Sequence, residues 1–223
     1  MIDPRKYILR RAAAKDIEFL ADVIIAAEKS GTENCGLANF YEITEEELKT
    51  YLIQILEEEI DGCELSLSSF LIIEYEGCPV AALGGWLEGA NEDEMPSALL
   101  KSNLLGYVLP REKMMLSRGK FDIVKPLQIE RTEGTYQLEY SYVEPEHTGQ
   151  FLVQWLMEEH EAFAKKTYPE VKHIQAHVFK NNPTIVLLHE MMGFHAVREY
   201  QSDNAETLKY FPYNIEILMQ KDL

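Results

Sequence analysis

The chain has 223 residues, of which 46% are hydrophobic and 26% are charged, and this composition excludes a wholly disordered, collagenous or coiled-coil protein. Asp and Glu number 38 against 21 Lys and Arg, which gives a net charge of −17. Such an acidic surface repels nucleic-acid phosphates and anionic lipids, so we expect neither a nucleic-acid nor a membrane partner. It favours a cationic ligand such as an amine.

The cysteines and the apolar segments indicate the compartment. Three cysteines occur without a CxxC pair or a Cys/His metal-ligand spacing, so we expect reduced, buried thiols and no metal site: Cys35, Cys63 and Cys78. The N-terminal residues contain no apolar segment long enough for a signal peptide. No run reaches the roughly 20 apolar residues that cross a bilayer. The sequence therefore predicts a soluble, cytoplasmic protein.

The N-terminal part of the chain predicts one strand and two helices. Residues 7–10 have the character of a short strand. Asp16 is placed to cap a helix whose apolar residues recur at helical spacing up to a stop at Gly31. Thr44 followed by Glu47 has the form of a capping box and predicts the start of a second helix.

A β-hairpin follows the second helix. Residues 70–75 and 79–87 are rich in strand formers, and a turn at Glu76-Gly77 separates them. Gly84 and Gly85 weaken the second strand, and they indicate a bulge or a close approach of another backbone.

The rest of the chain predicts an insertion and then a regular alternation. Residues 88–134 contain leucines and methionines that need burial, and we expect two helices there, over residues 96–109 and 110–119. The further strands are expected over residues 136–143, 173–179, 194–200 and 213–219, with one helix to about Lys166 and another from Asn182 to Gly193. This order predicts one α/β domain over residues 1–223, in which helices cover both faces of a mixed sheet and residues 88–134 form a helical insertion.

Two segments resemble the Gcn5-related N-acetyltransferase (GNAT) family. The first is Val143-Glu144-Pro145, which leads through Gly149 into a helix; the second is Asn182, followed eleven positions later by Gly193-Phe194. The resemblance covers roughly residues 7–200. It implies a mostly antiparallel sheet, acetyl-CoA as co-substrate, and direct transfer of an acetyl group to a primary amine of a small molecule or peptide.

The expected cofactor site lies where the strand ending at Val143 passes into a helix. A helix N-terminus presents unpaired N–H groups and a partial positive charge, which together bind a pyrophosphate with little help from side chains. In the family this pyrophosphate belongs to acetyl-CoA. The resemblance therefore assigns cofactor binding to Val143, Thr148, Gly149, Gln150, Phe151 and Asn182.

The loop departs from the family pattern, which is Arg/Gln-x-x-Gly-x-Gly/Ala. Thr148, Phe151 and Val153 occupy its three defining positions, and Gly149 is the glycine retained. Because any residue can adopt helical dihedral angles, the cradle of amides can persist without the missing glycines. Phe151 is compatible with phosphate binding if its ring turns away from the phosphate.

His189 is a candidate for protonating the leaving thiolate. It lies seven residues after Asn182, where many family members carry a tyrosine in this role. An imidazolium can donate a proton near neutral pH. The alternative is a partly buried histidine that packs under the sheet.

Glu139 is the candidate general base, because some family members place a glutamate on the strand before the loop. Strand alternation puts two groups of residues on opposite faces: Glu139, Ser141 and Val143 on one, and Leu138, Tyr140 and Tyr142 on the other. The alternative is a solvated surface glutamate, and Glu88 is a weaker candidate for the base.

Two functions follow from these residues. One is an acyl-CoA-dependent N-acyltransferase that acts without a covalent enzyme intermediate. The other is a non-catalytic GNAT-like binding protein whose cofactor loop has decayed, which the residues at the atypical positions favour: Thr148, Phe151, Val153 and His189. Exposed edge strands of such a fold also permit a homodimer.

Overall fold

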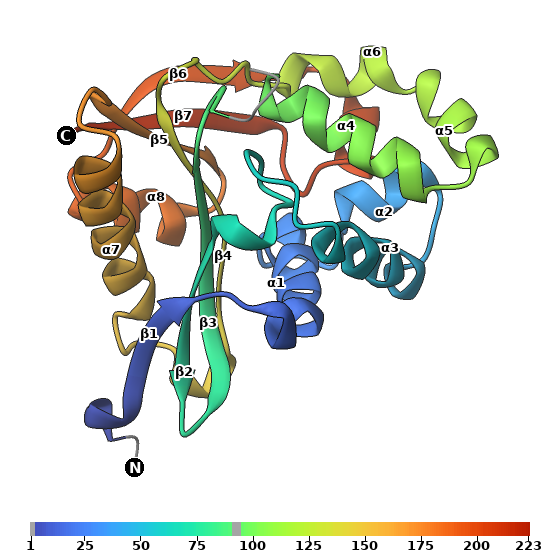
Figure 1. Cartoon of the computed structure of the whole chain (residues 1–223). Coiled ribbons are helices and arrows are strands. Elements are labelled where there is room, and N and C mark those ends of the chain that lie inside the picture. Colours follow the sequence, from blue (N-terminus) through green and yellow to red (C-terminus); the bar gives the residue numbers. More distant parts are fainter. Residues whose placement is uncertain (1–2, 91–94) are drawn as a thin grey trace.

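The computed structural model describes residues 3–90 and 95–223, and within them a seven-stranded sheet has the order β1-β2-β3-β4-β5-β7-β6 (Figure 1). The strands are β1 (Tyr7–Arg11), β2 (Phe70–Tyr75), β3 (Cys78–Leu87), β4 (Tyr136–Val143), β5 (His173–Phe179), β6 (His195–Gln201) and β7 (Ile215–Asp222). Neighbouring strands are antiparallel except β4 and β5, which are parallel. The predicted mixed, mostly antiparallel sheet is therefore confirmed.

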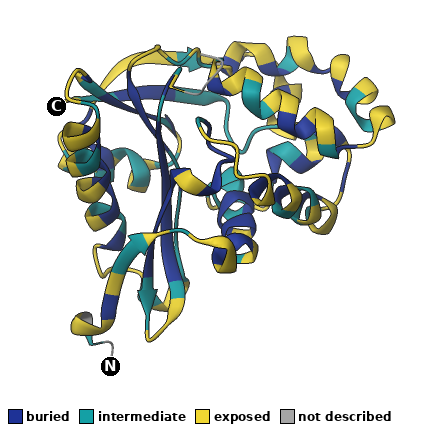
Figure 2. Ribbon diagram, in the orientation of Figure 1, coloured by how far each residue is buried: buried dark blue, intermediate teal, exposed yellow. Residues whose placement is uncertain are grey.

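Helices cover both faces of this sheet, as the sequence predicts. One face carries α1 (Ile17–Lys29), α2 (Gly36–Tyr41), α3 (Glu45–Glu57) and α4 (Ser97–Val108), and the other carries α7 (Leu152–Thr167) and α8 (Pro183–Met191). Each layer encloses its own apolar core, with Leu20 and Phe70 fully buried in the first and Ile73 and Leu156 in the second. Figure 2 shows the buried residues along the strands and on the helix sides that face them.

Two predicted helix caps have different outcomes. Thr44 forms the predicted capping box, because its hydroxyl accepts from the Glu47 N–H at 3.1 Å and the Glu47 carboxylate accepts from the Thr44 N–H at 2.8 Å. Asp16 is the N-cap residue of α1, as predicted, but its side chain makes no capping hydrogen bond to the helix. Its carboxylate is 1% exposed and accepts two hydrogen bonds from Arg10, at 2.7 and 2.9 Å, and one from the Ala13 N–H. A short 3₁₀ turn already holds Asp16 in a helical conformation, so its side chain does not reach the amides of α1.

The segment between β3 and β4 contains the two predicted helices, α4 and α5 (Arg111–Arg118), and also a short helix α6 (Phe121–Val124), which was not predicted.

Helix α2 was not predicted, since its six residues are too few to show a periodicity. It packs against the segment before β7 at Gly36, where a Cβ atom would lie 2.0 Å from the carbonyl oxygen of Tyr210. No larger residue fits at this position.

Strands β4 and β5 pair over a short distance and then part. Tyr136 lies opposite Ile174 and Leu138 opposite Ala176, and the register ends there. Next in β4 comes a bulge at Tyr140, whose backbone is left-handed with φ +58°. An extra residue in a strand reverses the direction of the side chains that follow.

The bulge overturns the alternation expected for β4. Leu138 packs in the core under α7, whereas Tyr140 and Tyr142 pack in the core under α1, so these three residues do not share a face. The predicted close approach of another backbone is confirmed at Gly84, whereas the close neighbour at Gly85 is a side chain. A Cβ atom would lie 2.9 Å from the Glu139 carbonyl oxygen at the first and 2.6 Å from His160 Nδ1 at the second.

Two further expectations concern cysteines and membrane segments. Cys35 and Cys63 are buried free thiols as expected, but Cys78 is exposed, because it opens β3 directly after the hairpin turn. Among the described residues no helix is both long and apolar enough to cross a membrane, and no group of three or more His, Cys, Asp or Glu side chains could hold a metal ion.

Candidate active site

A cleft opens where β4 and β5 part, and it runs to the first turn of α7. Its volume is about 60 Å³, and we refer to it as the β4–β5 cleft. Its walls include Leu138, Glu139, Val153, His177, Ile185 and His189. The fold therefore brings Glu139 and His189, the two residues predicted to transfer protons, into one cavity from β4 and α8.

Glu139 is not the solvated surface glutamate of the alternative interpretation. Its carboxylate is partly buried and accepts a hydrogen bond from Arg131 Nη2, in the segment before β4. Burial raises the pKa of Glu139, while the positive charge of Arg131 opposes the rise. Glu88, the weaker candidate, is 4% exposed and accepts from the Trp86 indole and the Ser97 N–H, so it holds the start of α4.

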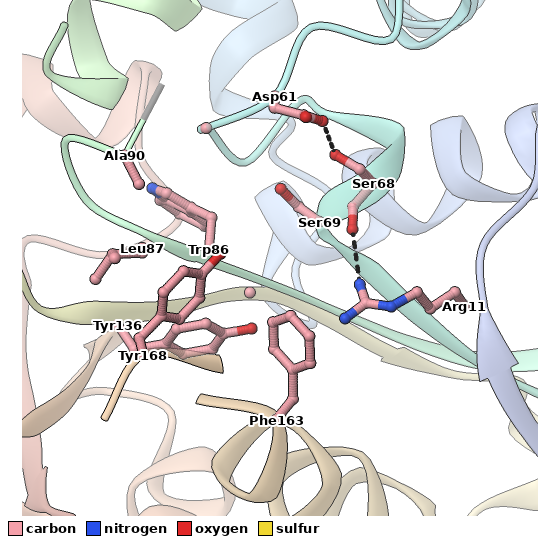
Figure 3. Close-up of a pocket in the computed structure, with 12 residues that line it drawn as sticks. Arg11, Asp61, Ser68, Ser69, Trp86, Leu87, Ala90, Tyr136, Phe163 and Tyr168 are labelled. Carbon is pink, nitrogen blue, oxygen red and sulfur yellow. Dashed lines mark hydrogen bonds between the residues drawn. The ribbon is translucent and has the colours of Figure 1, made fainter. Parts of the chain in front are cut away.

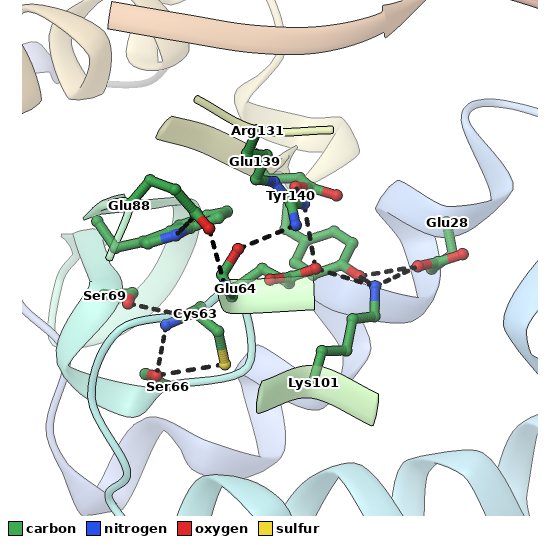
Figure 4. Close-up of polar contacts among 12 residues, drawn as sticks. Glu28, Cys63, Glu64, Ser66, Ser69, Glu88, Lys101, Arg131, Glu139 and Tyr140 are labelled. Atoms are coloured by element: carbon green, nitrogen blue, oxygen red, sulfur yellow. Dashed lines mark hydrogen bonds and ion pairs between the residues drawn. The ribbon is translucent and has the colours of Figure 1, made fainter. Parts of the chain in front are cut away.

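Glu139 belongs to a buried group of charges on the α1 face of the sheet (Figure 4). We call this group the ion cluster; its members are Glu28, Glu64, Lys101, Arg131 and Glu139. Arg131 Nη2 lies 3.1 Å from Glu64 Oε1, and Lys101 Nζ lies 3.2 Å from the same oxygen. Burial opposes ionisation of Glu64, but Arg131 and Lys101 hold its pKa below the ordinary value.

Tyr140 connects two members of the ion cluster. Its hydroxyl accepts a hydrogen bond from Lys101 Nζ and donates one to Glu28 Oε1, each at 2.8 Å. Both contacts depend on the bulge, which turns this side chain toward α1 and α4. The bulge thus determines the geometry of the cluster.

His189 is 7% exposed and packs edge-on against the ring of Phe194. Its Nδ1 lies 2.9 Å from the carbonyl oxygen of Ile185, which assigns the proton to Nδ1. Burial lowers the pKa of His189, so the ring is neutral at pH 7. In this form Nε2 carries a lone pair.

The loop between β4 and α7 is open to solvent. Thr148, Gly149 and Gln150 are exposed, and Phe151 adopts a left-handed backbone, with φ 59°, directly before α7. Phe151 is 71% exposed, so most of its ring faces solvent. The amides of that turn cannot pair within the helix, and they remain available to an anion.

The other two residues assigned to the cofactor have backbone and capping contacts. Val143 ends β4 and lies opposite Ala81 of β3. Asn182 caps α8, because its Oδ1 accepts from the Ile185 N–H at 3.4 Å, and its Nδ2 donates to Ser30 Oγ at 3.1 Å. Their contact with a cofactor stays a prediction, as does that of the loop residues.

A second and larger cavity, of about 210 Å³, lies where β3 extends beyond the end of β2 (Figure 3). Trp86, Tyr136 and Phe163 line it, and the Arg11 guanidinium lies 4.1 Å from the centre of the Phe163 ring. It shares no lining residue with the β4–β5 cleft and contains none of the predicted site residues. We therefore identify the smaller cleft as the candidate active site.

Most members of the ion cluster could not be predicted from the sequence. Glu28, Glu64, Lys101 and Arg131 come from four separate segments, and charged side chains in helices and loops are ordinarily solvated. The place of His177 in the cleft was not predicted either. Tertiary packing alone brings these residues together.

The mostly antiparallel sheet, with helices on both faces and a cleft between the parallel strands β4 and β5, agrees with the fold that the resemblance to the GNAT family implies. The profile of the family described as "Acetyltransferase (GNAT) family" matches residues 36–194. The chain belongs to this family.

Solved structures of acetyltransferases share this fold. An N-acetyltransferase from Staphylococcus aureus Mu50 has 12% identity and a TM-score of 0.66, with 96% of this chain and 99% of that chain covered. A putative acetyltransferase from Salmonella typhimurium with its cofactor acetyl-CoA has 13% identity, a TM-score of 0.55, and coverages of 97% and 94%. A polyamine N-acetyltransferase from Drosophila melanogaster, which forms N-acetylagmatine, has 13% identity, a TM-score of 0.54, and coverages of 97% and 100%. No curated protein matches the sequence.

Proposed function

We propose that the protein transfers the acetyl group of acetyl-CoA to a primary amine of a small molecule or peptide by direct attack. The observation that carries the proposal is the β4–β5 cleft, which Glu139 and His189 line together and which extends to Val153 in the first turn of α7. Acyl donor and acceptor can meet there from opposite faces of the sheet.

The first turn of α7 would bind the donor's pyrophosphate. Its unpaired amides and the helix dipole favour an anion, and most of the Phe151 ring beside them faces solvent. Thr148, Gly149 and Gln150 would contribute backbone contacts, and Val143 and Asn182 would flank the rest of the donor. Bound acetyl-CoA supplies the activated acyl group, and the other tasks belong to the chain.

Glu139 would act as the general base. An amine attacks only in its neutral form, so its ammonium ion must lose one proton before the C–N bond forms, and the nitrogen loses a second proton as the C–S bond breaks. Burial raises the pKa of Glu139 and makes its carboxylate a better proton acceptor, while Arg131 holds it in place. A neutral His189 would take up at Nε2 the second proton, which the nitrogen loses once the C–N bond has formed, and would then donate it to the departing thiolate.

Binding of acetyl-CoA is the first test. A ligand that binds the native state alone, at about 100 times its dissociation constant, stabilises a protein by about 2.7 kcal/mol, which for a chain of this size raises Tm by roughly 5–10 °C. We expect such a shift with acetyl-CoA in differential scanning fluorimetry.

Gln154→Glu is the matched variant for this test. The added charge favours the helix N-terminus but repels a pyrophosphate, so the variant should fold normally and lose most of the shift. Gln201→Glu, on the exposed edge strand β6, should keep the full shift. No shift of the unaltered protein with any acyl-CoA would favour the non-catalytic binding protein.

A further inference from the structure

The larger cavity lies at the edge of the sheet, where β3 continues beyond the start of β2 (Figure 3). Phe70, the first residue of β2, lies opposite Gly84, so the next residues of β3, up to Leu87, pair with β4 alone. Before Phe70 the chain forms a 3₁₀ turn, Leu67–Ser69, instead of extending the strand. The cavity therefore occupies the place where a longer β2 would lie.

Four aromatic rings form one wall of this cavity: Trp86, Tyr136, Phe163 and Tyr168. The ring centres of Phe163 and Tyr168 lie 5.9 Å apart, and each lies 6.4 Å from that of Tyr136. The Tyr136 hydroxyl donates a hydrogen bond to His160 Nδ1 at 2.9 Å, which fixes the orientation of this ring. The rings are in contact before any ligand binds, so this wall is preformed and suits a flat apolar group.

A cation and an anion lie across the cavity from these rings, and Ser68 holds both of them (Figure 3). Arg11 Nη1 donates to the Ser68 carbonyl oxygen at 3.2 Å, and the Asp61 carboxylate accepts from the Ser68 hydroxyl. Within residues 3–90 and 95–223, Arg11 and Asp61 form no ion pair, either with each other or with another side chain. Nε and Nη2 of Arg11 and Oδ2 of Asp61 have no hydrogen-bond partner in the same ranges.

These two opposite charges restrict the ligands that the cavity can bind. A ligand with a carboxylate alone is attracted by Arg11 but repelled by Asp61, and the reverse holds for a simple amine. A zwitterion satisfies both groups. In an α-amino acid the two charges are attached to one carbon atom, and the side chain on that carbon extends away from them. The volume of about 210 Å³ is below the roughly 300–1,000 Å³ of sites for drug-sized ligands, so it suits a molecule of this size.

We propose that the larger cavity binds a free α-amino acid with an aromatic side chain. The carboxylate would accept from Nε and Nη2 of Arg11, a planar pair of donors that matches its two oxygens. The ammonium group would donate to Asp61, and the ring would pack against the aromatic wall. The Phe163 ring, whose centre lies 4.1 Å from the Arg11 guanidinium, keeps that cation at the cavity. This site shares no lining residue with the β4–β5 cleft, and the inference does not depend on acetyl transfer.

The first test compares L-phenylalanine with two ligands that each lack one of its charges. Phenylpropionate has no ammonium group, and phenylethylamine has no carboxylate. In isothermal titration calorimetry we expect L-phenylalanine to bind at least about tenfold more tightly than either, as the loss of a charged hydrogen bond implies. Equal affinity for the three ligands, or no binding of L-phenylalanine, would overturn the proposal.

Variants then assign the binding to this cavity. Arg11→Gln and Asp61→Asn should each weaken L-phenylalanine at least about tenfold, whereas the first should not weaken phenylethylamine and the second should not weaken phenylpropionate. Arg5→Gln is the matched control, because the Arg5 side chain is 88% exposed and lies outside the cavity. Unchanged affinity for L-phenylalanine in either charge variant would contradict the assignment. Glu139→Gln should also bind L-phenylalanine normally, and a loss in this variant would place the ligand in the β4–β5 cleft instead.

Tryptophan fluorescence gives an independent measurement. The chain has two tryptophans, Trp86 and Trp155, and Trp86 lines the cavity. In Trp155→Phe, light that excites tryptophan but not phenylalanine reports on Trp86 alone. We expect its emission to change on titration with L-phenylalanine, with the dissociation constant that calorimetry gives. A constant emission while calorimetry shows saturation would mean that the ligand binds elsewhere, and would refute the proposal.

Discussion

The left-handed backbone of Tyr140 determines which chemical groups meet at the split in the sheet. Through the bulge, Glu139 and Tyr140 both serve the ion cluster although they are adjacent in sequence. A regular strand would direct them to opposite faces. One unusual dihedral angle thus places a carboxylate and a phenol side by side.

Glu139→Gln tests the general base. Glutamine keeps the size of the side chain and can still accept from Arg131, but it cannot take a proton. We expect kcat to fall on the order of 100-fold with any accepted amine. A base works when ionised, so the rate of the unaltered protein should rise with pH through a pKa above 4.5, because burial raises it. That acid limb should vanish in the variant.

Steady-state kinetics over the pH range measures both effects, with Glu199→Gln as the control, because Glu199 is an exposed residue of β6 that pairs with Lys180. An unchanged profile in Glu139→Gln would assign the proton transfer to another group. A fall in kcat with the acid limb retained would mean that Glu139 positions other residues.

Phe151→Gly tests the strained residue before α7. A left-handed backbone costs a non-glycine residue roughly 1–2 kcal/mol, and glycine avoids this cost while losing about 0.5–1 kcal/mol of chain entropy. The ring is exposed, so little buried surface is lost. We expect the free energy of unfolding in urea to stay equal or to increase, whereas Glu158→Gly, at an exposed position inside α7, should lose about 1 kcal/mol. Equal losses in the two variants would contradict this account.

At the scale of elements, helix α4 is attached to the sheet through Lys101. Its ammonium reaches Glu64, on the segment before β2, and the Tyr140 hydroxyl on β4. The polar contacts of this helix therefore continue into the candidate active site. Through these contacts the segment between β3 and β4 is connected to the residues around Glu139, the proposed general base.

Lys101→Met should destabilise the fold, because it leaves Glu28 without a counter-charge and Glu64 with Arg131 alone. Breaking a buried pair costs about 3–5 kcal/mol, and since the Lys101 side chain is 20% exposed we expect more than about 2 kcal/mol. Lys125→Met, at an exposed position after α6, should change stability by less than about 0.5 kcal/mol. Urea unfolding gives both values, and similar losses would show that the ion pairs add little.

Most elements could be predicted because their signals are local. The hairpin turn at Gly77, the box of Thr44 and the cap of Asn182 each involve residues within a few positions of one another. The bulge has no such signal, since tyrosine is rare in a left-handed conformation. The ion cluster depends on contacts between segments up to 112 residues apart, such as Tyr140 with Glu28, and a single sequence does not display these.

At the scale of the whole molecule, the net charge of −17 acts on every ligand that approaches. A negative field attracts a cationic acceptor and accelerates its association, and salt screens this attraction over about 10 Å at 0.1 M. The ion cluster, with three glutamates and two cations, has an excess of negative groups as well. Surface and site therefore both favour a cation.

Salt should lower kcat/KM for a cationic primary amine several-fold between about 20 mM and about 300 mM sodium chloride. Initial rates at saturating acetyl-CoA measure this, and sucrose at equal osmolarity is the control, because it changes water activity without screening charge. A value of kcat/KM that does not depend on salt would show that long-range attraction plays no part in capture of the acceptor.

The short pairing of β4 with β5 also has a mechanical consequence. Backbone hydrogen bonds set the spacing of these strands over three residues of each and not beyond. Past that point, a side-chain hydrogen bond links helices from opposite faces, because Asn182 at the start of α8 donates to Ser30, which directly follows α1. The gap between β4 and β5 is therefore bounded by backbone pairing on one side and by a side-chain hydrogen bond between the two helix layers on the other. We expect its width to vary more easily toward the side-chain contact than toward the paired strands.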